Sequence, residues 1–334
     1  MMKRRACLIA VLQVMFLFGF SKWAISAPDA ALVRAAKAEG EVSWYSSDSP
    51  AFNKMLADDF EKRYGVKVSV FRAASGDLQQ RYASERDSGR VAADVINSST
   101  SEFFDHGLAK GWFVPLPKAE VSAYDTWPKA QKTDAAVTFS IAPFVLVYNT
   151  NLVAAKDVPN TWTDLVKPEN RSRLMMADPK AAPTFLAFYR LWQQTLGADF
   201  VRGIGDAKPL LVQSLVPANE ALAAGERAFL FPGLEDFANP LIAKRAPLAI
   251  KVLGPTTGSV QHMGLSTKAK NPNAAKLFME FILSDEAQAL ITRDGRGPRY
   301  SPKVSAKLPP GYAAPDTQGA LANRDEVLNL LKMK

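Results

Sequence analysis

The sequence predicts an α/β protein composed of two successive α/β regions. A strand, a polar turn and a helix follow one another three times in about 70 residues near the start of the chain. A second set of strands and helices begins at about position 144. The chain has 334 residues, of which 48% are hydrophobic and 22% charged, and this suffices for two cored domains of about 100–200 residues each. Repeated strand–helix units predict a largely parallel sheet covered by helices.

The elements of the first region follow from hydrophobic patterning and capping residues. A short amphipathic helix is expected over 30–38, and a second begins at Ser49-Pro50 and ends at Tyr64-Gly65. A third helix opens at Ser75 and runs to Arg86. Strands are expected over 41–47, 66–72 and 93–97.

The second region repeats these patterns without a low-complexity linker. Thr161 is expected to start a helix, a long helix follows Thr184 and ends at Leu196, and a last one covers 271–285. Residues 232–236 are expected as a turn after their strand. Strands are expected over 144–149, 173–177, 228–231, 250–253 and 258–265.

The first 26 residues differ from the rest of the chain. Basic residues at 3–5 precede a nearly unbroken apolar run over 7–20, and small residues follow at 24–27. This order predicts a cleavable secretory signal, cut after Ser26, because the apolar run is shorter than the ~20 residues of a membrane span. An uncleaved anchor helix is the alternative. We therefore expect an exported, periplasmic protein.

Cysteine content and charge exclude several functions. Cys7 is the only cysteine, so a chain cut after Ser26 has no thiol for a nucleophile, a metal site or a disulfide. Cutting there removes four cations and no acid, which leaves 37 cations against 33 acids and lowers the net charge from +8 to +4. Because this excess is mild and forms no basic run, it argues against nucleic acid as a partner and slightly favours anionic ligands.

Polar residues follow each strand of the first region. Ligands of such sheets bind beyond the carboxyl ends of the strands, where helix N-termini converge and attract anions. These ends lie at 46–49, 73–76 and 97–100, and all are rich in Ser, Asn, Gly or Thr. The alternative is that these residues only form caps and turns. The candidate ligand contacts are Ser46, Ser47, Asp48, Arg72, Ser75, Ser98 and Ser99.

The second region offers both charges. Lys180 and Thr184 precede a long helix and suit a phosphate or carboxylate. Gly233 allows the backbone to approach a ligand, and Glu235 and Asp236 suit an ammonium group or orient a cation. An anion-binding wall opposite such an acidic turn would fit a zwitterion, for example an amino acid or an aminophosphonate. The alternatives are a solvated lysine, an ordinary cap and a solvated turn.

Two further candidates lie near the expected junction of the regions. Tyr148 is placed to close over a ligand, or else it packs between strand and helix. His262 is a candidate for a hinge or pocket role. His106 is expected to be solvated at a helix end, and the two histidines lack the spacing of a metal site.

Several segments, taken in order, resemble the family 1 extracellular solute-binding proteins. They include the strand over 41–47, DDFEKRYGVKV at 58–68 and Ala93-Asp94-Val95. The later ones are 147–149, 168–174 with Ser-Arg in place of Gly-Lys, 271–288 and 298–304. Within this family the chain is most similar to the branch that contains the ferric-ion-binding proteins.

The resemblance implies a type II periplasmic binding fold. Two α/β lobes are then joined by two crossover hinge strands, near 139–144 and 258–265, and a small-molecule ligand sits between them. The implied partner is the permease of an ABC importer in the inner membrane, and the protein is expected to act as a monomer. The expected organisation is a signal at 1–26, lobe 1 at 27–140, lobe 2 at 141–262, a return to lobe 1 at 263–305 and a helical tail at 306–334, placed on lobe 2.

The ligand and the rival functions stay open at this point. Expected ligands are organic acids, phosphonates or phosphate esters, and zwitterions, with no cofactor. Iron is an alternative, although the adjacent tyrosines of the ferric-binding relatives are absent from 232–237. A periplasmic hydrolase is a rival, but the sequence contains no G-x-S-x-G, H-E-x-x-H or P-loop motif, so we expect no enzyme activity. A ligand-sensing subunit of a receptor would share the same fold.

Overall fold

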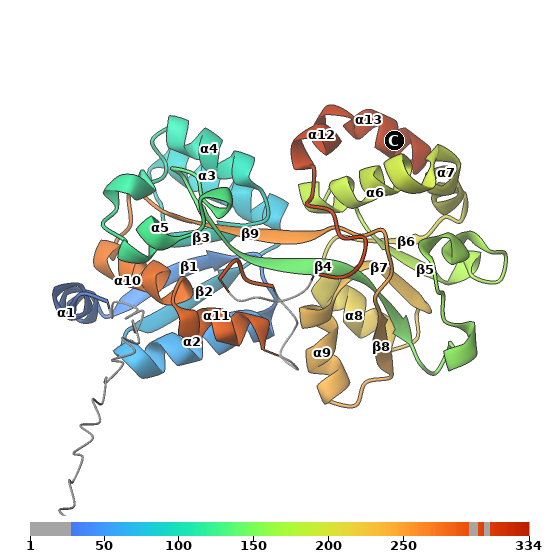
Figure 1. Ribbon diagram of the computed structural model, residues 1–334, viewed down its shortest axis with the longest axis horizontal. Helices are drawn as coiled ribbons and strands as arrows, with labels where there is room; N and C mark the ends of the chain where they lie inside the picture. Colours follow the sequence, from blue (N-terminus) through green and yellow to red (C-terminus); the bar gives the residue numbers. More distant parts are fainter. Residues whose placement is uncertain (1–27, 294–299, 304–307, 334) are drawn as a thin grey trace, which may run out of the picture.

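The computed structural model consists of two α/β lobes that lie side by side (Figure 1). It describes residues 28–293, 300–303 and 308–333, so the expected signal segment and Cys7 lie outside the described residues. The strands follow one another in the order β2-β1-β3-β9-β4-β7-β5-β6, and β8 pairs with β4. The two-lobed α/β arrangement predicted from the sequence is confirmed.

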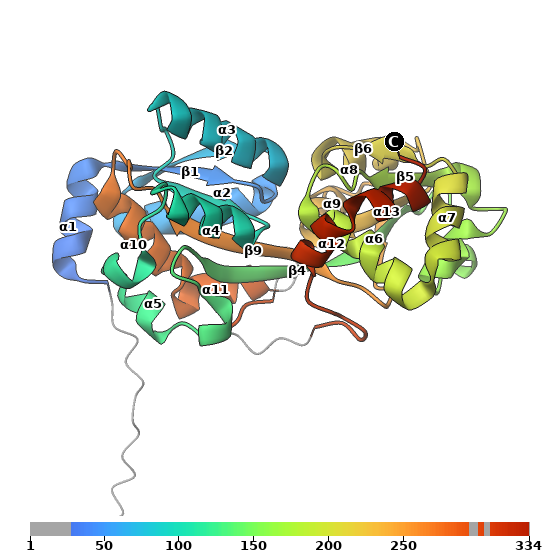
Figure 2. The same ribbon diagram turned by 90° about the horizontal axis from the view of Figure 1, so that it is seen from above.

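Lobe 1 is built on parallel strands whose two faces are both covered. β1 pairs with β2 on one edge and with β3 on the other, both in parallel, and β9 joins β3 in antiparallel orientation. In Figures 1 and 2, α3 and α4 cover one face, and α2, α10 and α11 cover the other. The strands are β1 (Glu41–Ser46), β2 (Lys67–Arg72) and β3 (Val95–Ser98). The helices are α1 (Ala30–Glu39), α2 (Pro50–Tyr64), α3 (Ser75–Ser88), α4 (Ser101–Ala109), α5 (Ser122–Thr126), α10 (Pro272–Ile282) and α11 (Asp285–Thr292).

Alternation along the lobe 1 strands explains this double covering. Trp44 packs into the core beneath α2 and α10, whereas its neighbour Tyr45 packs into the core beneath α3 and α4. Val95 and Ile96 divide between the same two cores. Because successive side chains of a strand point to opposite faces, a strand that is apolar at consecutive positions needs helices on both sides.

Two strands cross between the lobes. β4 (Val137–Asn149) pairs with β9 (Gly258–Leu265) along its first half, in antiparallel orientation. Along its second half, β4 pairs with β7 on one edge and β8 on the other. The crossings therefore lie where the sequence predicted them, and β4 is longer than expected because one continuous strand serves both lobes.

Lobe 2 repeats the mixed pattern of lobe 1. β5 pairs in parallel with β6 and with β7, and the second half of β4 is antiparallel to β7. The strands are β5 (Leu174–Ala177), β6 (Leu210–Val212), β7 (Phe229–Leu234) and β8 (Leu248–Lys251). The helices are α6 (Pro183–Leu196), α7 (Ala198–Asp206), α8 (Leu215–Ala223), α9 (Glu235–Ala243), α12 (Thr317–Ala322) and α13 (Arg324–Leu330).

The end of the chain packs on lobe 2. α12 lies against α6, and α13 lies against α6 and α7 (Figure 2). Val327 and Leu331 of this segment are buried in the core of that lobe. The residue boundaries of the lobes stay a prediction. Within the described part of the chain, no helix combines the length and the apolar character that crossing a membrane requires.

Two local expectations were wrong. The segment after Phe231 is not a turn, because β7 continues to Leu234 and α9 begins directly at Glu235. The acidic pair therefore occupies the first turn of a helix, where carboxylates interact favourably with the helix dipole. The helix expected from Thr161 is a 3₁₀ segment over Trp162–Val166. A capping box between Thr161 and Asp164 forms its N-terminal end.

Candidate functional site

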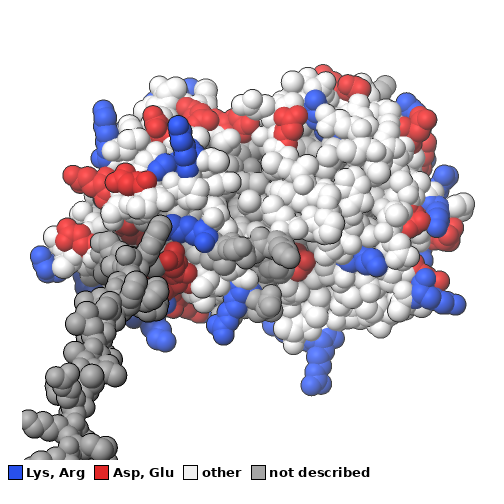
Figure 3. All heavy atoms as spheres, in the orientation of Figure 1, with Lys and Arg blue, Asp and Glu red and all other residues white. Residues whose placement is uncertain are grey.

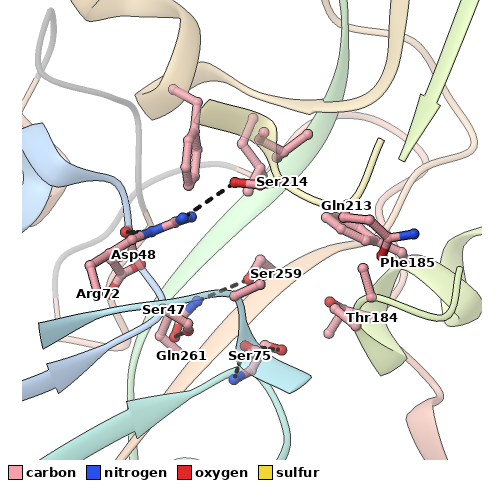
Figure 4. Close-up of a pocket in the computed structure, with 17 residues that line it drawn as sticks. Ser47, Asp48, Arg72, Ser75, Thr184, Phe185, Gln213, Ser214, Ser259 and Gln261 are labelled. Carbon is pink, nitrogen blue, oxygen red and sulfur yellow. Dashed lines mark hydrogen bonds between the residues drawn. The ribbon is translucent and has the colours of Figure 1, made fainter. Parts of the chain in front are cut away.

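The described residues enclose a cavity between the two lobes, at the carboxyl ends of the lobe 1 strands (Figure 4). Its volume is about 50 Å³, which is room for about three to five water molecules, so a larger solute requires the lobes to lie further apart than in this structure. Lobe 1 and the crossing strand β9 contribute Ser47, Asp48, Arg72, Ala74, Ser75, Ser99, Ser259 and Gln261. Lobe 2 contributes Ala181, Ala182, Thr184, Phe185, Gln213, Ser214, Leu215, Leu234 and Phe237.

A buried hydrogen-bond network holds the lobe 1 wall in place. Trp44 Nε1 donates to Asn97 Oδ1 at 2.7 Å, which fixes the orientation of the amide. Asn97 Nδ2 then donates to Asp48 Oδ2 at 3.0 Å and to Gln261 Oε1 at 2.8 Å. Ser47 Oγ donates to the same Gln261 oxygen at 3.2 Å. Because Asn97 is wholly buried, these bonds preorganise the polar wall before any ligand arrives.

Ser75 and Ser99 form a second polar pair on this wall. The Ser99 backbone N–H donates to Ser75 Oγ at 3.2 Å, and Ser99 Oγ donates to the same oxygen at 2.9 Å. Ser75 is the first residue of α3, and Ser99 lies just before α4. The pair thus joins two helix starts at the edge of the cavity.

Arg72 supplies the positive charge of the cavity. Among the described lining residues it is the one cation. Its Nε donates to the Asp48 carbonyl at 3.2 Å, and its Nη1 donates to Ser214 Oγ of lobe 2 at 3.3 Å. Its guanidinium carbon lies 5.7 Å from the centre of the Phe237 ring, also in lobe 2. Burial lowers the pKa of Arg72, and the carboxylates of Asp48, Asp236 and Asp77 oppose this shift.

Three helix N-termini open onto the cavity. Residues at the start of α3, α6 and α8 all contribute to its lining. In each of these helices the cap side chain makes no capping bond, and Ser214 instead accepts from Arg72. First-turn N–H groups carry partial positive charge. Together with Arg72 they bring positive charge to a cavity whose one lining carboxylate among the described residues is that of Asp48, and this favours an anionic group.

Six of the predicted site residues line the cavity, and eight do not. The lining residues are Ser47, Asp48, Arg72, Ser75, Ser99 and Thr184. Ser46 and Ser98 lie behind the wall, where Ser46 Oγ donates to Asn53 at 2.7 Å and Ser98 accepts from Gln79 at 2.7 Å. Outside the lining are also Tyr148, Lys180, Gly233, Glu235, Asp236 and His262.

Local contacts explain why several of these side chains lie elsewhere. Tyr148 packs on the apolar core of lobe 2, and Lys180 is exposed. Gly233 leaves room for β4, because a Cβ there would lie 2.5 Å from Val147 Cγ2. His262 pairs with Thr138, whose Oγ1 lies 2.9 Å from His262 Nδ1, on the opposite face of β9 from Gln261. Burial lowers the pKa of His262 to about 4.

The acidic pair stands beside the cavity and not in its wall. Asp236 is buried, and Glu235 is partly buried at the first position of α9. Burial, with a smaller contribution from Asp236, raises the pKa of Glu235 to about 7. Among the described residues, no three His, Cys, Asp or Glu side chains come together in the way that would hold a metal ion.

Several lining residues were missed by the sequence analysis. Ser259 and Gln261 share one face of β9, and the alternation of that strand was a signal that pointed to them. Gln213 and Ser214 lie at a short strand that was not expected, and Gln213 Nε2 donates to Asp178 Oδ2 at 2.5 Å. Phe185 and Phe237 were attributed to no site because apolar helix residues usually belong to the core.

The comparisons agree with this geometry. Residues 43–296 match the family model described as bacterial extracellular solute-binding protein. An uncharacterized protein of Haemophilus influenzae is 24% identical over 300 residues, which cover 86% of this chain and 85% of that one. This chain belongs to the bacterial extracellular solute-binding proteins, as its sequence segments predicted.

Two solved structures show the same fold. The substrate-binding protein of an ABC transporter from Agrobacterium tumefaciens superposes with a TM-score of 0.73 and 18% identity, over 87% of this chain and 92% of that one. The periplasmic binding protein AfuA of Actinobacillus pleuropneumoniae, with fructose-6-phosphate bound, superposes with a TM-score of 0.68 and 20% identity, over 88% and 99%. The type II periplasmic binding fold is confirmed.

Proposed function

We propose that this protein is the periplasmic substrate-binding component of an ABC importer, which captures a small anionic solute between its lobes and delivers it to the permease. The observation that carries this proposal is the cavity itself. Arg72 and three helix N-termini converge on it, and the two lobes that form it are joined by the crossing strands β4 and β9. An anionic group is attracted both by Arg72 and by the partial positive charge of the helix N-termini.

The interlobe contacts support a mechanism of closure. Arg72 of lobe 1 reaches Ser214 and Phe237 of lobe 2, and α2 approaches α9 across the same gap. Closure by rotation about the crossing strands is the expected response to a ligand that contacts both walls. A permease can then recognise the closed form and receive the solute when the lobes open.

A thermal-shift screen tests the proposal. The purified protein is denatured and refolded to remove carried-over ligand, and then mixed with organic acids, phosphonates, sugar phosphates, amino acids, polyamines and ferric citrate. A compound at 100 times its dissociation constant stabilises the folded state by about 2.7 kcal/mol, a rise in melting temperature of a few degrees for a chain of this size. We expect anionic compounds to raise the melting temperature and to be recovered unchanged. Silence across the set, or consumption of a compound that binds, would contradict the proposal.

A further inference from the structure

The two walls of the cavity differ in character. The lobe 1 wall presents the guanidinium of Arg72, the hydroxyls of Ser47, Ser75 and Ser99, and the amide of Gln261. The lobe 2 wall presents mainly hydrocarbon, from Phe185, Leu215, Leu234 and Phe237 together with two alanines. Each of these four large side chains is almost buried and contributes to the lining, and Figure 4 shows Phe185 beside Thr184 and Gln213.

Two of the three polar side chains that lobe 2 contributes to the lining, Gln213 and Ser214, already have hydrogen-bond partners, and the third is Thr184 at the start of α6. Gln213 donates to Asp178, and Ser214 accepts from Arg72. A ligand hydroxyl turned toward Phe185, Leu215, Leu234 or Phe237 would meet hydrocarbon, lose its bonds to water and gain few in return. The wall suits an apolar body.

The charges near the cavity favour a plain anion over a zwitterion. Asp48 is wholly buried, and its Oδ2 accepts a hydrogen bond from Asn97, so the carboxylate is part of the hydrogen-bond network of the lobe 1 wall. Glu235 and Asp236 lie outside the lining. Arg72 has five N–H donors, and its hydrogen bonds to described partners use two of them. A ligand carboxylate thus meets a cation with spare donors, whereas an ammonium group would meet Arg72 as a like charge and a single lining carboxylate among the described residues, that of Asp48, which is buried and bonded to Asn97.

We propose that the ligand is a small organic acid with one carboxylate and an apolar body, oriented with the carboxylate on the lobe 1 wall at Arg72 and the body on the lobe 2 wall. This inference rests on the proposed function and narrows its ligand class. A hydroxylated acid of the same length has the same carboxylate but places hydroxyls against the lobe 2 wall. An α-amino acid of the same skeleton adds a positive charge beside the guanidinium of Arg72.

Calorimetric titration with matched six-carbon acids tests this orientation. Hexanoate and gluconate differ in the hydroxyls of the body, and isocaproate and leucine differ in the ammonium group. We expect hexanoate and isocaproate to bind at least about 100-fold more tightly than gluconate and leucine, since a hydroxyl facing an apolar pocket alone changes selectivity by about that factor. Glycerol phosphate serves as a small, fully polar anion and is expected to bind as weakly as gluconate.

Variants of the lobe 2 wall give a second readout. Leu215→Gln, at the first position of α8, is expected to weaken hexanoate binding at least tenfold and to leave gluconate binding unchanged or stronger. Phe185→Tyr, which keeps the ring and adds a hydroxyl, is expected to act in the same direction if Leu215→Gln fails to fold. The control is Leu321→Gln on α12, where the side chain is 45% exposed and does not belong to the lining; it is expected to bind as the wild type does.

The outcomes separate the two proposals. Gluconate, leucine or glycerol phosphate binding as tightly as hexanoate would overturn the inference and leave the transport function intact. Equal loss of hexanoate and gluconate binding in Leu215→Gln would also overturn it, because the lobe 2 wall would then support the site without selecting the body. No binding by any compound of this set or of the wider screen would overturn both.

Discussion

In the cleft, Arg72 supplies a positive charge, whereas Asn97 holds neighbouring polar side chains in place. Arg72 brings the positive charge and touches both lobes. Asn97 fixes the carboxylate of Asp48 and the amide of Gln261 through a network of three buried hydrogen bonds that begins at Trp44. Removing a partner from such a network leaves buried polar groups unsatisfied, which costs more than the bond contributed. The site therefore depends on residues that touch no ligand.

Glu235 provides a prediction for pH dependence. Its pKa is raised to about 7 in the folded protein, while in the unfolded chain it is about 4.3. Between these values the folded state holds a proton that the unfolded state has lost, so this group makes the free energy of unfolding fall as pH rises. Glu235→Gln removes the effect and is expected to raise the free energy of unfolding above pH ~7 by about 1–3 kcal/mol. Urea denaturation across pH ~4 to ~8 measures it.

His262 changes the free energy of unfolding with pH in the opposite direction to Glu235, and this gives the test a second readout. Burial lowers the pKa of His262 to about 4 in the folded protein. Between about pH 4 and 6.5 the imidazole is therefore protonated in the unfolded chain and neutral in the folded protein. Stability therefore falls as pH drops, and this slope partly cancels that of Glu235 in the wild type. In Glu235→Gln the contribution of His262 is no longer cancelled, so the free energy of unfolding should rise from pH ~4 to ~6.5. Glu286→Gln, at an exposed position of α11, is the control. Identical pH profiles for Glu235→Gln and the wild type would contradict the assignment.

The sequence predicted the residues at strand ends better than those at strand faces. Ser47, Arg72, Ser75 and Ser99 line the cavity because parallel strands place their carboxyl ends at one edge. His262 was selected for its imidazole, yet its neighbour Gln261 faces the cleft. The choice between two adjacent residues depends on strand register, which is set by pairing partners more than 100 residues away in the chain.

Helix starts are the elements that build both walls. α3 and α4 meet at Ser75 and Ser99 in lobe 1, and α6 and α8 begin at the cavity in lobe 2. Capping residues predicted α2, α3 and α6 from the sequence. The start of α9 was missed because a continuous β7 leads directly into the helix without a turn.

The approach of α3 to lobe 2 leads to a prediction for closure. A Cβ at Gly76 would lie 3.1 Å from the carbonyl oxygen of Ala181 in lobe 2. Gly76→Leu should obstruct this approach and weaken ligand binding at least about tenfold. The melting temperature of the ligand-free protein should stay equal or rise, since glycine costs a helix about 0.5–1 kcal/mol. Titration and thermal melting measure the two effects.

A matched substitution separates closure from helix propensity. Gln80→Leu introduces the same side chain one turn later in α3, where Gln80 is exposed. We expect it to bind ligand as the wild type does. Unchanged affinity in Gly76→Leu, or an equal loss in both variants, would show that the contact with Ala181 is not part of the closed form.

At the scale of the whole molecule, charges of both signs are mixed over the surface (Figure 3). Lysines and arginines are interspersed with acidic residues over the face shown in Figure 3, as the mild net charge of the sequence indicates. The two-lobed topology could be predicted because the order of strands and helices carries it. The composition of the cavity could not, since its two walls come from segments that the fold alone brings together.

The central claim is that a solute is held between lobes that close on it, and a distance measurement between the lobes tests it most directly. Lys54→Cys on α2 and Lys244→Cys at the end of α9 place spin labels on exposed sites of the two lobes, and Cys7 lies in the segment expected to be removed. Lys54→Cys with Lys118→Cys, both exposed in lobe 1, is the control pair. With a saturating amount of the compound that gives the largest thermal shift, we predict a shorter and narrower distance between the lobes and no change in the control pair. The same interlobe distances with and without that compound would contradict the account.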